Sequence, residues 1–130
     1  MSKRSELREK IMVILYQIEI YKSNSINYDI DQVINENMEI ENDFLKEIVY
    51  GVNLHIDELD EIADTYMKDW SIKRIDQTGA SILRMAIYEL KYTDTPEIVV
   101  INEAVELAKK YSDDSVRKII NAVLDRMISE

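Results

Sequence analysis

Apolar residues arranged around a whole helix circumference are the feature that most constrains this fold. Between Ile82 and Leu90, apolar side chains occupy positions 82, 83, 85, 86, 87 and 90. A helix that is apolar on nearly every side has to be enclosed by other elements. The sequence therefore predicts a buried central helix over about residues 80–92, with Thr78 and Gly79 as its cap.

The segments on either side also show helical spacing. Residues 5–22 carry apolar side chains every three or four positions, which predicts a first helix, and Ile30, Val33 and Ile34 indicate a short second one. A helical pattern runs from Asn42 to Trp70 with a break near residues 55–57, so it is one bent helix or two.

Two further helices follow the central one. Thr95 as a cap and Pro96 in the first turn are a typical helix start, and this helix continues to about Tyr111. Ser112 and Asp113 then begin the last helix.

The composition agrees with an all-helical chain. Its 130 residues include two glycines, one proline and no cysteine, which disfavours a turn-rich β-architecture and rules out disulfides and thiolate metal sites. We predict the all-α class, with one compact domain spanning residues 1–130 and about seven helices. No apolar run reaches the roughly 20 residues of a membrane span and no signal-peptide core is present, so we expect a cytoplasmic protein and no membrane contact.

The charge is unevenly distributed. The formal net charge is −10 at pH 7, and residues 29–69 hold thirteen acidic side chains and only two lysines. Residues 1–28, in contrast, hold five basic and three acidic side chains. The N-terminal end is therefore the part suited to a phosphate backbone, while the acidic middle suits a basic protein partner.

Nothing in the sequence indicates an enzyme. His55 is the only histidine, which excludes sites built on several imidazoles, and there is no glycine-rich phosphate loop. The carboxylates of residues 57–64 are most simply a solvated acidic face, because no calcium-type loop accompanies them. We predict no catalytic residues, no metal and no cofactor.

The N-terminal basic residues are the candidate nucleic-acid contacts. On a helix, Arg4 and Arg8 share a face, so their guanidinium groups could follow successive phosphates, with Lys3 beside them. From composition alone an ordinary charged helix start explains them better, because Glu6 and Glu9 neutralise part of the positive charge. Tyr16 and Tyr111 could stack on unpaired bases, although tyrosines at helical spacing are more often part of the core or its edge.

A longer pattern extends these inferences. The order ILR-A-YEL in residues 82–90, then Pro96, then INEAVELAK in residues 101–109, then N-x-VLD in residues 121–125 resembles the NusB family, small helical RNA-binding proteins of bacterial transcription antitermination. The resemblance covers most of the chain. It implies two packed three-helix bundles.

The resemblance also implies partners and site residues. Family members bind a short single-stranded leader RNA called boxA together with NusE, a ribosomal protein of the small subunit, and act on the transcription elongation complex in ribosomal RNA operons. RNA contacts are implied at Lys3, Arg4 and Arg8, and at Tyr111, Ser115 and Lys118.

The chain departs from the family pattern at two places. Gly79-Ala80 stands where an acidic-basic pair is usual, and Ile119 and Ala122 replace a phenylalanine and a glycine. Gly79 and Ile119 are therefore the positions expected to alter partner binding. Two hypotheses stand, an RNA-binding antitermination factor acting with NusE, and a helical protein-interaction module that has kept the fold and lost RNA binding.

Overall fold

The computed structural model describes residues 3–130, and within them the chain forms seven α-helices and no strand. The helices are α1 (Lys3–Ser23), α2 (Ile30–Asn37), α3 (Asp43–Leu54), α4 (Ile56–Tyr66), α5 (Gln77–Tyr92), α6 (Glu97–Tyr111) and α7 (Asp114–Ile128). The predicted all-α class with about seven helices is confirmed.

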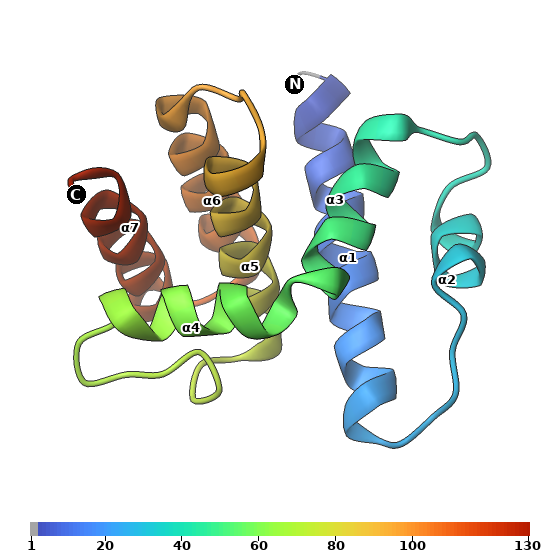
Figure 1. Ribbon diagram of the computed structural model, residues 1–130, viewed down its shortest axis with the longest axis horizontal. Coiled ribbons are helices and arrows are strands. Elements are labelled where there is room, and N and C mark those ends of the chain that lie inside the picture. The colour runs from blue at the N-terminus through green and yellow to red at the C-terminus, as the bar shows by residue number, and fades with distance from the viewer. Residues whose placement is uncertain (1–2) are drawn as a thin grey trace.

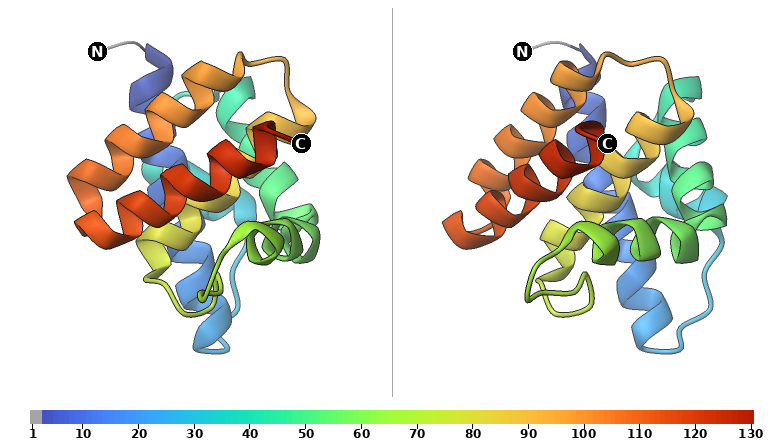
Figure 2. Two further views of the ribbon diagram at one scale, coloured as in Figure 1. Left: turned by 90° about the vertical axis from the view of Figure 1, so that its left-hand side faces the viewer. Right: turned by 60° about the vertical axis from the view of Figure 1, so that its left-hand side comes forward.

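The helices form two groups that meet at α1 and α5. In Figure 1, α1, α2 and α3 lie on one side and α5, α6 and α7 on the other, with α4 crossing beside them. The views in Figure 2 show α6 and α7 side by side and α5 behind them. These are the two packed three-helix bundles that the family resemblance implied.

Helix α5 is the centre of the molecule, as its apolar circumference predicted. It packs against α1, α3, α4, α6 and α7, and every residue from Gly79 to Glu89 is buried. Ile82, Leu83 and Ile87 have no exposed surface. The apolar faces of the other helices are thereby removed from water against one shared element.

Two predicted helix starts are displaced. The cap of α5 is Asp76 rather than Thr78 and Gly79, because the Asp76 carboxylate accepts a hydrogen bond from the Gly79 amide at 3.3 Å. Helix α6 begins at Glu97, and Pro96 takes the cap position that Thr95 was expected to hold. The start of α7 is as predicted, since Asp113 accepts from the Val116 amide.

The long helical pattern of residues 42–70 is two helices, α3 and α4, which break at His55. The expected continuation to Trp70 is wrong. Helix α4 ends at Tyr66, Asp69 adopts a φ of 62°, and the Trp70 side chain is 45% exposed. Met67 already has extended backbone angles at the end of α4, and the left-handed Asp69 then turns the chain before Trp70.

No helix within residues 3–130 has the length and apolarity to cross a membrane.

The central position of α5 can be tested by placing one charged side chain at a buried position of this helix. We expect Ile87→Asp to lower the free energy of unfolding by several kcal/mol, because an unpaired carboxylate would enter a fully buried position. Ile98→Asp is the matched control, since Ile98 is 69% exposed. Circular-dichroism melting compares the two. A melting temperature for Ile87→Asp as high as that of the control would contradict the buried position of α5.

Candidate nucleic-acid interface

A buried ion pair joins the two bundles at Arg8. Its guanidinium donates two hydrogen bonds of 3.0 Å to the Glu89 carboxylate of α5, and both side chains are almost completely buried. A third nitrogen lies 3.5 Å from Glu103 of α6, which also accepts a hydrogen bond from Ser5. Helix α1 is thus fixed to both α5 and α6.

A second arginine makes a similar set of contacts, but it belongs to α5 rather than to α1. Arg84 of α5 donates two hydrogen bonds, of 2.7 and 3.1 Å, to Asp60 of α4, and lies 3.8 Å from Glu19 of α1. The first pair places its arginine on α1 and the second places its arginine on α5. The two pairs together define how α1 lies along α5.

Arg8 is therefore not the exposed cation that the sequence suggested. Its side chain is 4% exposed and its nitrogens are directed at two carboxylates. A phosphate could reach it only by breaking a buried pair, which is costly because the remaining carboxylate would be left unpaired. The sequence expectation that Arg4 and Arg8 present two free guanidinium groups is wrong for Arg8.

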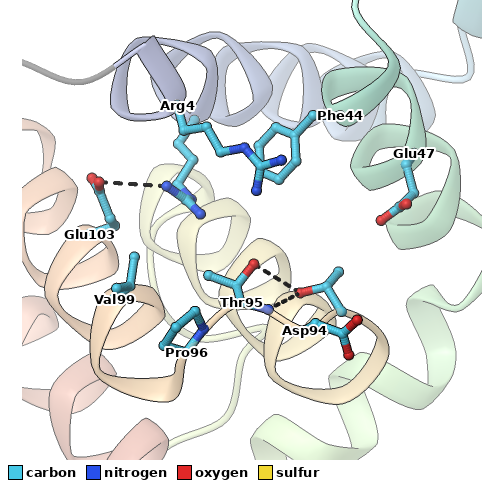
Figure 3. Close-up of a pocket in the computed structure, with 10 residues that line it drawn as sticks. Arg4, Phe44, Glu47, Asp94, Thr95, Pro96, Val99 and Glu103 are labelled. Carbon is cyan, nitrogen blue, oxygen red and sulfur yellow. Dashed lines mark hydrogen bonds and ion pairs between the residues drawn. The ribbon is translucent and has the colours of Figure 1, made fainter.

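Arg4 and Lys3 are exposed, unlike Arg8. The Arg4 guanidinium carbon lies 4.2 Å from the centroid of the Phe44 ring of α3 (Figure 3). Within residues 3–130 Arg4 has no ion-pair partner. The stacked ring leaves the guanidinium edge free to bind an anion.

A second group of polar side chains lies where α6 ends, around the predicted contact Tyr111. Glu9 of α1 accepts hydrogen bonds from Lys110 at 2.7 Å and from the Tyr111 hydroxyl at 2.6 Å. These hydrogen bonds, first that of Lys110 and then that of Tyr111, lower the pKa of the Glu9 carboxyl, and the bond to Glu9 raises the pKa of Lys110. The Lys110 ammonium also lies 5.2 Å from the Tyr111 ring centroid.

Tyr16 belongs to the same side of the molecule. It stands seven residues after Glu9, two helical turns, and so shares the face of α1 that meets α6. Both tyrosines are exposed, Tyr16 by 39% and Tyr111 by 44%. Two aromatic rings are therefore available to solvent on neighbouring helices.

The start of α7 adds the last predicted contacts. Ser115 donates to the Asp113 carboxylate at 2.9 Å, and Lys118 lies 3.5 Å from Asp114. The pKa of Asp113 is lowered by the Val116 amide and then by Ser115, and that of Asp114 chiefly by Arg117. Both side chains, Ser115 and Lys118, are exposed and lie in the first two turns of α7, the helix that follows Tyr111.

Gly79 and Ile119 occupy unlike environments. Gly79 is buried where α5 meets α7, and a Cβ there would come within 2.6 Å of Val116 and 2.8 Å of Asp76. Glycine allows this close approach, and the position offers a partner no side chain. Ile119 is half-buried and packs against the core. The involvement of both residues in partner binding stays a prediction.

Sequence reasoning missed Phe44 and Lys110. Phe44 falls within the helical pattern of residues 42–70, and nothing in the sequence brings it to Arg4. Lys110 was visible beside Tyr111 but was not singled out, because its partner Glu9 lies in another helix. No group of three or more metal-ligating side chains occurs within the described residues 3–130.

Two packed helical bundles, with exposed tyrosines and lysines gathered where helices end, define the class of small all-helical binding proteins. The sequence matches the model of the NusB family over residues 5–129. It is 42% identical over 125 residues to the transcription antitermination protein NusB of Staphylococcus aureus strain JH9, which covers 95% of this chain and 97% of that protein. The chain belongs to the NusB family.

Solved structures show the same relationship. NusB of T. maritima has a TM-score of 0.84 and 29% identity, covering 99% of this chain and 92% of that one. A crystal structure of the antitermination factors NusB and NusE in complex with dsRNA has a TM-score of 0.81 and 25% identity, covering 97% and 96% of the two chains.

The buried pair at Arg8 predicts a double-mutant outcome. We expect Arg8→Met to lower the free energy of unfolding by about 3–5 kcal/mol, because Glu89 would be left buried and unpaired. Arg8→Met combined with Glu89→Leu should recover most of that loss, since no charge then remains. Lys110→Met is the control, because exposed ion pairs contribute little. Urea unfolding measures the stability of all three variants. An Arg8→Met variant as stable as the parent would refute the structural role of Arg8.

Proposed function

We propose that this chain is an antitermination factor that binds boxA-type single-stranded RNA together with NusE in the transcription elongation complex. The relation to NusB of S. aureus over 95% of the chain carries this proposal. The structural neighbour that holds NusB, NusE and RNA supports it. We treat residues 1–130 as one RNA-binding domain that acts in the cytoplasm by binding rather than by catalysis.

The surface at the end of α6 is the part best suited to RNA. Tyr16 and Tyr111 are exposed rings on which unpaired bases can stack, a contact worth about 1–3 kcal/mol per base. Lys118 and Lys110 supply positive charge and Ser115 supplies a hydroxyl for the phosphate backbone. Asp114, the partner of Lys118, is exposed, and Glu9, the partner of Lys110, is half-buried, so a phosphate can replace Asp114 at little cost and Glu9 at a greater one.

Lys3 and Arg4 extend this surface toward the beginning of α1. Arg4 is about 18 Å from Tyr16 along the helix, at 1.5 Å per residue. That span corresponds to a few nucleotides of extended single strand. Arg8 has a different role in this proposal, because it positions α1 from the interior.

Electrostatics explain why a partner is needed. The chain has a formal charge of −10, and its RNA-facing lysines are already paired with Glu9 and Asp114. Such a protein attracts a polyanion weakly. NusE, as a basic partner, would cover acidic surface and add its own cations.

The pairing of these lysines with carboxylates favours a second candidate function. If Lys110 and Lys118 stay with their carboxylates, the chain is a helical protein-interaction module with the NusB fold, and its acidic residues 29–69 provide the docking surface. Ile119 in place of the family phenylalanine agrees with this alternative. RNA binding distinguishes the two functions.

The RNA surface can be tested in an electrophoretic mobility shift with NusE present. We expect a boxA-type RNA to bind at least about tenfold more tightly than a scrambled RNA. Tyr111→Leu should weaken boxA binding about tenfold, or ~1.4 kcal/mol, because one stacking ring is lost.

Tyr50→Leu is the matched control for Tyr111→Leu. Tyr50 is 40% exposed and, like Tyr111, donates its hydroxyl to a carboxylate, but it lies on α3. We expect this variant to bind like the parent. Equal affinities for boxA and scrambled RNA would support the interaction-module alternative, and equal effects of the two tyrosine variants would place the RNA elsewhere.

A further inference from the structure

A groove of about 520 Å³ opens at the other end of α6, between the start of α1, the first turns of α3 and the α5–α6 junction (Figure 3). Its walls carry Arg4 and Phe44 on one side and Asp94, Pro96 and Val99 on the other, with Glu47 facing across. The groove is distinct from the tyrosine and lysine surface at the end of α6, since α6 is fifteen residues long and so separates them by about 22 Å. Arg4 belongs both to the groove wall and to the proposed extension of the RNA surface.

Two carboxylates in this groove have nothing to bind. Within residues 3–130, Glu47 and Asp94 have no hydrogen-bond or ion-pair partner, and both are exposed. Glu103, which also lines the groove, is already engaged by Arg8 and Ser5. Glu47 and Asp94 come from α3 and from the α5–α6 junction, so a single cation in the groove can meet a carboxylate from each side.

The walls around these carboxylates are apolar. Val99 is 38% exposed, Pro96 is exposed, and the half-buried Phe44 ring forms part of the opposite wall. Ile98, the neighbour of Val99, is 69% exposed. Exposed apolar groups beside acidic ones suit a long aliphatic side chain that ends in a cation.

Charge complementarity decides between the classes of occupant. A nucleic acid would meet the Glu47 and Asp94 carboxylates, which repel phosphate. Among the described residues that line the groove, Arg4 is the one cation without an ion-pair partner, and it lies over Phe44 rather than between Glu47 and Asp94. A basic segment of protein fits this charge pattern and an RNA does not.

We propose that this groove docks a lysine- or arginine-bearing segment of a protein partner. The cation lies between Glu47 and Asp94, and its aliphatic stem packs on Val99 and Phe44. The inference rests on the proposed function in one respect, that NusE is the basic protein chosen as the probe. Because the groove and the tyrosine and lysine surface lie at opposite ends of α6, both can be occupied at once, with the Arg4 side chain remaining on Phe44 at the groove wall.

The test compares two pairs of charge-removing substitutions. Glu47→Gln with Asp94→Asn removes the two groove carboxylates, and Asp57→Asn with Glu61→Gln removes two exposed carboxylates of α4 outside the groove. The two double variants have the same net charge. Binding of purified NusE is measured by isothermal titration calorimetry, and binding of boxA-type RNA alone by mobility shift.

We expect the groove variant to bind NusE at least about tenfold more weakly than the parent, with RNA binding not weakened. The α4 variant should bind NusE within about twofold of the parent. Circular dichroism checks that both variants fold, and both are expected to because all four side chains are exposed.

Four outcomes would overturn the inference. Equal weakening of NusE binding by the two variants would show a general charge effect and no specific groove. Parent-like NusE binding by the groove variant would place NusE elsewhere and leave the proposed function standing. Loss of RNA binding in the groove variant would make RNA the occupant. If NusE does not bind the parent protein at all, the proposed function fails and the groove inference fails with it.

Discussion

The Arg8–Glu89 ion pair is the interaction on which the rest of this structure depends. Both groups are almost fully buried and each satisfies the other through two hydrogen bonds of 3.0 Å. A buried charge without its partner is too costly to tolerate, so α1 can lie along α5 only where these two side chains meet. Arg84 adds the reverse pair farther along the same two helices, and Glu103 ties α6 into the first pair.

The register set by this pair determines what reaches the surface. With Arg8 turned inward, the next residue, Glu9, lies against Lys110 and Tyr111 at the end of α6, and Tyr16 follows on the same face two turns later. Arg4, one turn before Arg8, meets Phe44 at the opposite end of α6. One internal contact thus places a tyrosine and lysine surface at one end of the molecule and an acidic groove at the other.

The spacing of apolar residues predicted the fold well, because a helix must carry apolar side chains on every side that it buries. The apolar circumference of residues 82–90 correctly indicated a central helix, and the break at His55 was visible in the pattern of residues 42–70. The cap of α5 was placed at Thr78 and Gly79, since the sequence does not show that the Asp76 carboxylate lies within reach of the Gly79 amide. Trp70 continued the apolar stripe, but the chain leaves the helix at Met67, whose backbone is extended.

The candidate site was harder to predict, because its chemistry depends on contacts between distant residues. An arginine near the N-terminus looks the same whether it faces a phosphate or a glutamate 81 residues away. Gly79 differs from the family pattern in sequence, but only the structure shows that it lies buried against Val116.

This chain is proposed to bind RNA jointly with NusE. The affinity for boxA-type RNA at constant salt, measured with and without saturating NusE, tests that proposal most directly. We expect the affinity to be at least about tenfold tighter with NusE, a coupling of about 1.4 kcal/mol. Equal affinity in the two conditions would contradict it.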